Sequence, residues 1–439
     1  MNHLESWGRY PKTTQNVRQV RWSSDTLPNA REGELFLPFG LGRSYGDGCL
    51  NDGGTLLATR AMNRFLDFDP GTGILRCEAG ASLDAILQFA VPEGWFLPTT
   101  PGTKFVTVGG AVANDVHGKN HHRAGTFGCH VKRFELLRSD GRRLVCSPTE
   151  NPQLFAATIG GLGLTGLITW VEFALRPIAS AMIDVESVKI RNLDDFFEVS
   201  EESDKAFEYT VAWVDCLARG TALGRGILMR GNHAKEAGEL RTHRQPRLNV
   251  PLDFPSLALN HLSVQAFNTL YYGRLKQRVT RAVKHYDPFF YPLDAVNHWN
   301  RIYGRRGFFQ YQFTIPFSSN AGAIREVFER IAKSGQGSFL AVLKTFGDIP
   351  SPGMLSYPSP GITLALDFSN KGERTFKLFE QLNSVVMEAG GRYYPAKDAW
   401  MPPEAFARSY PNWEQFQAFI DPSFSSSFWR RVTRAEAKR

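Results

Sequence analysis

Cysteine is scarce in this chain, and its few cysteines are not arranged for cross-linking or metal binding. Its 439 residues include five, an odd number with no closely spaced pair: Cys49, Cys77, Cys129, Cys146 and Cys216. Disulfide frameworks and thiolate metal centres use paired or closely spaced cysteines. We therefore expect neither kind of site, and we expect a reducing compartment.

Long hydrophobic runs are also missing. No stretch approaches the ~18 apolar residues that a membrane-spanning helix needs, and the longest runs, such as "SFLAVLKTF", have the length of buried strands. The first residues, "MNHLESWGRYPKTTQ", contain no apolar core of a secretion signal. These features predict a cytoplasmic protein. A peripheral position at the inner membrane stays open, on the cytoplasmic or the periplasmic face.

The charge balance is basic but has no concentrated tract. The chain carries 51 Lys and Arg against 43 Asp and Glu, a formal net charge of +8. Such an excess is compatible with nucleic acid, an anionic membrane surface or a phosphorylated ligand, and it selects none of them. We find no motif of the common RNA-binding modules, so nucleic acid is not an expected partner.

The order of apolar segments predicts an α+β protein. Between residues 33 and 180, short strands alternate with glycine turns, and two helices are expected over 82–94, with Ser82 as N-cap, and 151–161. From about residue 181, glycines thin out and aromatic residues increase. Strands in "GFFQYQFTIP", "SFLAVLKTFG" and "GITLALDFSN", with amphipathic helices over 321–335 and 372–391, predict a sheet covered by helices on one face.

Three glycine-rich loops are the main chemical signal. They are "LPFGLGRSYGDG" (37–48), "PGTKFVTVGGAVANDVHGKN" (101–120) and "GGLGLTG" (160–166). The third contains G-x-G-x-x-G, but a helix precedes it and a strand follows, which reverses the order of a Rossmann dinucleotide site. Glycine loops can point backbone N–H groups at an anion. Three of them indicate one long ligand touched at several points, such as an adenine dinucleotide.

Four of the ten histidines lie in or beside the second loop: His117, His121, His122 and His130. A metal site needs histidines on one face with further ligands. The adjacent pair would point to opposite faces of a strand, and "DVHGKNHH" is a poor helix, so no metal is expected. For His117 the residues alone leave two interpretations open, a polar loop packed on the core and a cofactor-pocket wall that reaches substrate.

The order of these segments resembles a known family. "GLGRSYGDG", "PGTKFVTVGGAVANDVHGKNHHRAGTFG", "GGLGLTG", "YTVAWVDCLARG", "HYDPFFYPLDAVNHWNRIYGRRGFFQYQF", "SFLAVLKTFG" and "GGRYYPAKD" are similar to vanillyl-alcohol-oxidase-type flavoproteins, and within them to the oxidases of polyprenylphosphoryl ribose. The resemblance implies a two-domain vanillyl-alcohol-oxidase/PCMH-type FAD-binding fold with an antiparallel-sheet substrate domain. It implies an FAD-binding domain over 1–180, a substrate-binding domain over 181–391 and a C-terminal return to the first domain over 392–439.

The resemblance also implies the cofactor contacts. Many relatives tether FAD through a histidine where this chain has Arg43, so FAD is expected to be non-covalent. The expected FAD-binding residues come from the three loops and the C-terminal segment: Gly40, Leu41, Gly42, Arg43, Ser44, Tyr45, Gly46, Asp47, Gly102, Thr107, Val108, Gly109, Gly110, Asn114, His117, Ile168 and Tyr394.

By the same resemblance, the substrate-binding residues are Trp213, Tyr291, Gln312, Lys344 and Ala365, and the catalytic residues are Lys397, His117 and Tyr45. The mycobacterial relatives carry a cysteine at the position that matches Ala365 of this chain. Inhibitors that react with that thiol should therefore form no covalent bond with this protein. A cation near the flavin can stabilise the charge of the reduced ring. Lys397 is the candidate for that role, and which of the three residues is the base stays open.

The implied reaction is oxidation of the 2-hydroxyl of a polyprenyl-phosphate-linked ribose to a 2-keto sugar, by hydride transfer to flavin N5. It is the first half of an epimerisation to arabinose, an arabinan precursor for the cell wall. The implied partners are an NAD(P)H-dependent keto-sugar reductase, a quinone-like electron acceptor and a membrane surface. The alternatives are an FAD-dependent oxidase of a soluble sugar, alditol, aldonolactone or nucleoside, and a flavin-free binding protein.

Overall fold

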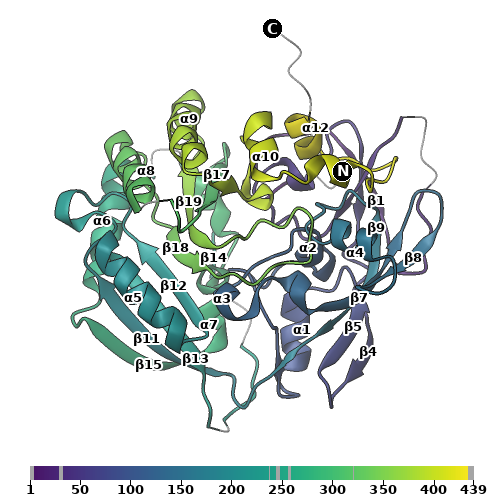
Figure 1. The fold of residues 1–439 in the computed structure, drawn as a ribbon, viewed down its shortest axis with the longest axis horizontal. Coiled ribbons are helices and arrows are strands. Elements are labelled where there is room, and N and C mark those ends of the chain that lie inside the picture. Colours follow the sequence, from purple (N-terminus) through teal and green to yellow (C-terminus); the bar gives the residue numbers. More distant parts are fainter. Residues whose placement is uncertain are drawn as a thin grey trace.

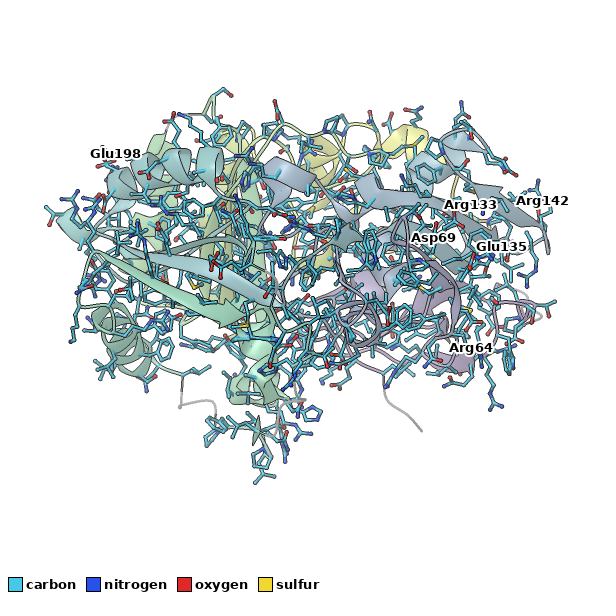
Figure 2. The ribbon with its side chains drawn as sticks, turned by 90° about the horizontal axis from the view of Figure 1, so that it is seen from below. Arg64, Asp69, Arg133, Glu135, Arg142 and Glu198 are labelled. Atoms are coloured by element: carbon cyan, nitrogen blue, oxygen red, sulfur yellow. The ribbon has the colours of Figure 1, made fainter. Side chains whose placement is uncertain are left out.

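The computed structural model describes residues 4–28, 33–236, 238–243, 248–255, 259–319 and 321–433. The elements from the first part of the chain occupy one half of the molecule, and the large sheet from the middle of the chain occupies the other (Figure 1). Glu198 on α5 and Arg142 in the β7–β8 turn lie near opposite ends (Figure 2). Among the described helices, none has both the length and the apolar composition needed to cross a bilayer.

The first half contains two main sheets. One is parallel and has the order β1-β3-β2, with β1 Asn16–Gln19, β3 Thr55–Ala58 and β2 Phe36–Phe39. The other is antiparallel and has the order β4-β5-β9-β7-β8, with β4 Phe65–Asp69, β5 Ile74–Glu78, β9 Leu167–Ala174, β7 Val131–Leu137 and β8 Arg143–Cys146. The short strands β6 Trp95–Phe96 and β10 Arg176–Pro177 pair with each other.

The helices of this half are short: α1 Leu83–Ala90, α2 Val108–Ala113, α3 His121–Ala124 and α4 Pro152–Thr158. The predicted N-cap is confirmed, because the Ser82 side chain accepts a hydrogen bond from the Ala85 amide, 3.1 Å away. Helix α4 precedes the third glycine loop and β9 follows it, which is the helix–loop–strand order predicted from the sequence. One apolar core joins α1, α2 and the five-stranded sheet.

The second half contains an eight-stranded antiparallel sheet. Its order is β15-β11-β13-β12-β18-β19-β17-β20, with β15 Val279–His285, β11 Met182–Ile190, β13 Gly226–His233, β12 Tyr209–Val214, β18 Ala341–Phe346, β19 Gly361–Ser369, β17 Phe308–Ile315 and β20 Arg392–Tyr393. Two further strands, β14 Leu248–Asn249 and β16 Val296–Asn297, pair in parallel.

Helices cover one face of this sheet. The amphipathic helices α5 Leu193–Ala206, α8 Ala321–Ser334 and α9 Glu373–Glu388 pack their apolar sides into one core with the sheet. The prediction of a sheet covered by helices on one face is therefore confirmed. The remaining helices are α6 His261–Gly273, α7 Tyr286–Phe290, α10 Pro403–Ser409, α11 Trp413–Gln417 and α12 Ser427–Thr433.

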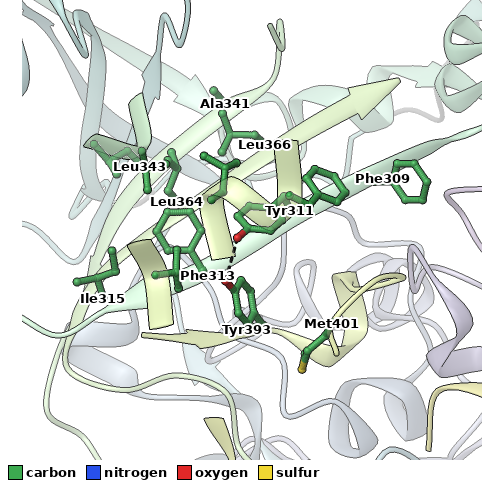
Figure 3. Close-up of a cluster of buried hydrophobic side chains, with 14 of the residues drawn as sticks. Phe309, Tyr311, Phe313, Ile315, Ala341, Leu343, Leu364, Leu366, Tyr393 and Met401 are labelled. Atoms are coloured by element: carbon green, nitrogen blue, oxygen red, sulfur yellow. Dashed lines mark hydrogen bonds between the residues drawn. The ribbon is translucent and has the colours of Figure 1, made fainter. Parts of the chain in front are cut away.

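Alternation along β17 separates the core from the opposite face. Phe309, Tyr311, Phe313 and Ile315 belong to the core under the helices, where Tyr311 and Tyr393 hydroxyls lie 2.9 Å apart (Figure 3). Because successive side chains of a strand point to opposite faces, the residues between them point away from this core. The sheet therefore presents a second, partly polar face, and that face forms one wall of the site.

Both ends of the chain are fastened to the first glycine loop. The Trp7 amide donates to the Ser44 carbonyl (2.8 Å) and the Tyr45 amide donates to the Ala396 carbonyl (2.9 Å). Arg431 on α12 makes two hydrogen bonds to the buried Asp47 carboxylate, at 2.8 and 2.9 Å. The loop is thus held between the segment around Trp7 and the segment 396–431.

Candidate active site

A cavity of about 350 Å³ lies between the two halves of the molecule. Its walls come from all three predicted glycine loops, the open face of the eight-stranded sheet, the segment 290–299 and the C-terminal residues 394–397. Segments that are hundreds of residues apart in the sequence therefore meet at one place. This is the convergence that the glycine loops predict.

Glycines let the first two loops approach the cavity closely. A Cβ at Gly40 would lie 2.4 Å from the Thr107 hydroxyl oxygen, so the loops touch here only because residue 40 has no side chain. Gly102 also lines the cavity, and a Cβ there would meet no heavy atom within 4 Å. A larger residue at 102 would therefore project into open space and reduce the cavity.

The floor of the cavity is the open face of the sheet. Gln310 and Gln312 of β17 line it, alternating with the core residues, and so do Thr363 and Ala365 of β19. Trp213 of β12 and Lys344 of β18 complete this wall. The Trp213 indole donates a hydrogen bond to the Phe339 carbonyl, 2.9 Å away, which fixes the ring against the cavity.

Lys397 enters the cavity from the C-terminal segment. Its Nζ lies 3.9 Å from the centre of the Tyr45 ring, and among the described residues it has no hydrogen-bond partner. Burial lowers the pKa of Lys397, and the nearby Asp367 carboxylate opposes that shift. Burial raises the pKa of Tyr45 well above its ordinary value, so the phenol keeps its proton.

Asp367 is a buried carboxylate behind this lysine. It accepts hydrogen bonds from the Gln310 amide (2.6 Å) and the Tyr303 hydroxyl (3.4 Å) and is only 1% exposed. Burial raises the pKa of Asp367, and its hydrogen bonds and the charge of Lys397 act in the opposite direction. The protonation of Lys397 and that of Asp367 therefore depend on each other.

His117 is held at both ring nitrogens. Its Nε2 lies 3.1 Å from the Gln312 side-chain nitrogen and its Nδ1 lies 2.9 Å from Lys344 Nζ, which also donates to the Gly118 carbonyl at 3.0 Å. Burial and the neighbouring lysine charge lower the pKa of His117 well below its ordinary value. The imidazole is therefore neutral, and its two nitrogens are occupied by protein groups. The structure places His117 on the cavity wall, and its contact with a cofactor or a substrate stays a prediction.

Positive charge dominates the cavity wall. The described lining residues include one carboxylate, that of Asp294, and four basic side chains, those of Arg43, Lys119, Lys344 and Lys397. Burial lowers the pKa of Lys119 to about 8, and Lys119 Nζ donates to the Phe290 carbonyl at 2.9 Å. Burial raises the pKa of Asp294 to about 6. Four basic groups against one acid offer countercharge to an anionic ligand, and burial lowers the pKa of the three lysines among them.

Most of the predicted site residues line the cavity. Those from the predicted cofactor set are Gly40, Leu41, Gly42, Arg43, Ser44, Tyr45, Gly102, Thr107, Gly109, Gly110, Asn114, His117, Ile168 and Tyr394. Those from the substrate and catalytic sets are Trp213, Gln312, Lys344, Ala365 and Lys397. The structure therefore brings them together, while their individual roles stay predictions.

Four predicted residues are not among those that line the cavity. Gly46 packs against the Asp398 carbonyl, and the Asp47 carboxylate binds Arg431. Val108 is fully buried in the apolar core. Tyr291 is also buried, with its hydroxyl 2.7 Å from that of Thr100, while its neighbours in sequence line the wall. Packing inside the protein occupies each of these side chains or its position, and the roles assigned to these four residues stay predictions.

The sequence prediction missed three functional candidates, Lys119, Asp294 and Asp367. Lys119 lies two residues after His117 in the loop singled out above. Asp367 is in phase with Ala365 and Thr363 along β19, so strand alternation could have placed it on the cavity side. The one signal in the sequence for Asp294 was its place at the end of the quoted segment "FFYPLD".

No group of histidine, cysteine and acidic residues suitable for a metal ion occurs among the described residues. An elongated anionic cofactor, by contrast, fits the residues present. Close-packed glycine backbone, the open space at Gly102 and the basic side chains offer both room and countercharge for a dinucleotide.

Comparisons with known proteins agree with this geometry. Residues 25–147 match the family model described as an FAD binding domain. The chain is 35% identical to the decaprenylphosphoryl-β-D-ribose oxidase of Mycolicibacterium smegmatis, over 98% of this chain and 97% of that protein. It is 33% identical to an uncharacterized protein of Streptomyces coelicolor, over 80% of this chain and 99% of that protein. It is 28% identical to the D-lactate dehydrogenase of Anaerostipes hadrus, over 33% of this chain and 31% of that protein.

Proposed function

We propose a substrate and a proton path for a chain that belongs to the family of the decaprenylphosphoryl-β-D-ribose oxidase. The chain is an FAD-dependent oxidoreductase with the α+β, PCMH-type fold that the sequence predicts. Its substrate, we infer, is a polyprenyl-phosphate-linked ribose, oxidised at the 2-hydroxyl to the keto sugar. The observation that carries this proposal is the single cavity in which glycine loops and four basic side chains converge.

The division of labour follows from the two sides of the cavity. We assign the glycine loops, with Arg43, to the cofactor, which when bound supplies the acceptor for the hydride. Arg43 lies over the Trp7 ring at 3.9 Å and cannot replace a tethering histidine, so FAD is held without a covalent bond. The domain boundaries, at about residues 180 and 391, are part of the same proposal.

We assign Lys119 and Lys344, on the sheet side, to the phosphate of the substrate. Both side chains are desolvated, so their charges act on an anion through a medium of low effective dielectric constant. Burial lowers the pKa of both amines, and a bound phosphate would favour their charged forms. The apolar wall that includes Trp213 and Val342 leaves room for the start of the lipid.

Lys397 is our candidate for the group that receives the hydroxyl proton. Its lowered pKa gives it a neutral fraction near neutrality, and its Nζ has no hydrogen-bond partner among the described residues. His117 has both nitrogens occupied and Tyr45 keeps its own proton, so neither is free to accept one. After the transfer, the resulting ammonium leaves a positive charge in the cavity. We assign His117 and Tyr45 to positioning: His117 holds Gln312 and Lys344, and Tyr45 packs against Lys397.

The test is anaerobic mixing of the purified holoprotein with a polyprenyl-phosphoribose in detergent. We expect the flavin absorbance near ~450 nm to bleach and a keto sugar to form. A soluble ribose phosphate without the lipid separates the main proposal from the alternative. Bleaching by soluble sugars, alditols, aldonolactones or nucleosides, and not by the lipid-linked sugar, would favour that alternative. A quinone analogue and an NAD(P)H-dependent reductase, added afterwards, test the proposed acceptor and partner.

A further inference from the structure

Exposed apolar side chains gather in one part of the described chain. Among the described residues, twelve large hydrophobic ones are exposed, and eight of them lie between positions 248 and 283: Leu248, Leu252, Phe254, Leu262, Phe267, Leu270, Val279 and Val283. Soluble monomers rarely expose so many apolar side chains in one region, and such a region commonly marks a binding surface. The concentration begins beside the cavity segment 290–299, because β14 pairs with β16.

Helix α6 presents two of the three most exposed of these residues. Leu262 and Leu270 are eight residues apart, two turns along one face, and are 73% and 76% exposed. Buried Val264 and Asn268 attach the helix to the protein, and the Asn268 side chain donates to Asp215 at 2.9 Å. The apolar face of α6 is therefore held outward on a fixed helix.

An aromatic series joins this face to the cavity. Phe267, 42% exposed, stacks on Tyr271 with ring centres 5.7 Å apart, and Tyr271 lies 4.5 Å from Trp213. Tyr271 and Trp213 both line the cavity. A continuous apolar path therefore runs from the inner wall to the outer face of α6.

The charge next to this face is positive. Arg274, Lys276, Arg278 and Arg281 follow α6, all exposed, and no acidic residue lies between positions 254 and 286. Asp195 binds Arg278 (2.8 Å) and Glu186 binds Arg281 (2.6 Å), so those two charges are partly neutralised. Arg274 lies over the Tyr271 ring at 3.7 Å. The basic residues continue into β15, where Val279 and Val283 are also exposed. Figure 1 places α6 and β15 at the same end of the molecule.

We propose that α6, the basic turn 274–278 and β15 form a docking surface for an anionic lipid bilayer. Apolar residues bordered by arginine and lysine match the acyl boundary and the anionic headgroups of such a surface. This proposal rests on the proposed function, because a lipid-linked substrate would remain in the membrane while its sugar reaches the cavity. The aromatic series then follows the direction in which the lipid leaves the site.

Vesicle sedimentation with the holoprotein and no substrate tests this surface. The probes are vesicles of phosphatidylcholine alone and of equal parts phosphatidylcholine and phosphatidylglycerol. We expect binding to the anionic vesicles, and a loss of about tenfold or more in L262S/L270S, because both leucines would lose apolar burial in the bilayer. The matched control is L66S/F317S, which removes two exposed apolar residues elsewhere. We expect this control to bind like the wild type.

Three results of the vesicle assay would overturn the proposal. They are no binding by the wild type, equal binding to neutral and anionic vesicles, and an equal loss in the two double variants. A wild-type dimer that L262S/L270S dissociates, without vesicle binding, would assign the face to a second copy of the chain and also overturn it. Flavin content and bleaching by the lipid-linked sugar in detergent, measured on the same variants, report on the proposed function separately.

Discussion

Replacing Lys397 by methionine tests the proposed proton acceptor most directly. Methionine keeps most of the apolar stem beside Tyr45 and removes the amine. Asp367 would lose the positive charge that lowers its pKa, so it would take up a proton and stay buried as a neutral acid. Gln310 and Tyr303 remain next to it. We therefore expect K397M to fold and to keep its FAD.

The expected loss of rate follows from one charge. A unit charge about 4 Å from a developing opposite charge is worth ~4 kcal/mol at an effective dielectric constant of ~20. Since ~1.36 kcal/mol corresponds to a factor of ten, the bleaching rate should fall about 10³-fold. That is within the ~10²–10⁴-fold range of general base catalysis.

The assay is anaerobic stopped-flow measurement of flavin bleaching at saturating substrate, with K333M on the exposed side of α8 as the control. In the wild type, the rate should rise with pH as the Lys397 amine loses its proton. In D367N, the carboxylate that raises the pKa of Lys397 is absent, so this rise should move to lower pH. A K397M rate within threefold of wild type, or an identical pH profile in D367N, would refute the reasoning.

Three further predictions test other parts of the site. G102L should lower FAD content, because the new side chain projects into the cavity, and equilibrium dialysis against free FAD measures this; unchanged affinity would contradict the cofactor assignment. D47N should lower the free energy of unfolding by about 3 kcal/mol, since it breaks a largely buried ion pair with Arg431. Urea denaturation measures that loss, and flavin content should not change, whereas FAD loss without loss of stability would support a direct role of Asp47 in FAD binding. Burial lowers the pKa of Lys119 from 10.5 to about 8, so the unfolded chain binds more protons between those values and the apoprotein should become more stable as the pH rises through this window. K119M should flatten that rise in pH-dependent unfolding, and an unchanged slope would show that another group titrates there.

The sequence was informative where local rules act alone. The N-cap Ser82, the helix before the third glycine loop and the strand in "GFFQYQFTIP" all depend on neighbours in the chain, and the structure confirms them. The convergence of the three loops was also predictable, because their shared composition needs a common ligand.

Long-range pairing was harder to predict. Asp47 lies in the right loop, but its carboxylate is taken by Arg431, 384 residues away, and no local pattern shows that pair. Tyr291 misses the cavity because its hydroxyl meets Thr100, again far along the chain. Asp367 was overlooked although strand alternation places it correctly, since a buried acid in an apolar strand is meaningful only when its lysine neighbour is known.

The fastening of the first glycine loop by both ends of the chain has a consequence for biosynthesis. A ribosome adds Ala396 and Arg431 more than 340 residues after Tyr45, and each contacts the segment around Tyr45. During translation the loop therefore lacks these supports until the segment 396–431 has emerged. Flavin loading should accordingly be post-translational, and nascent chains stalled before residue 390 should capture none.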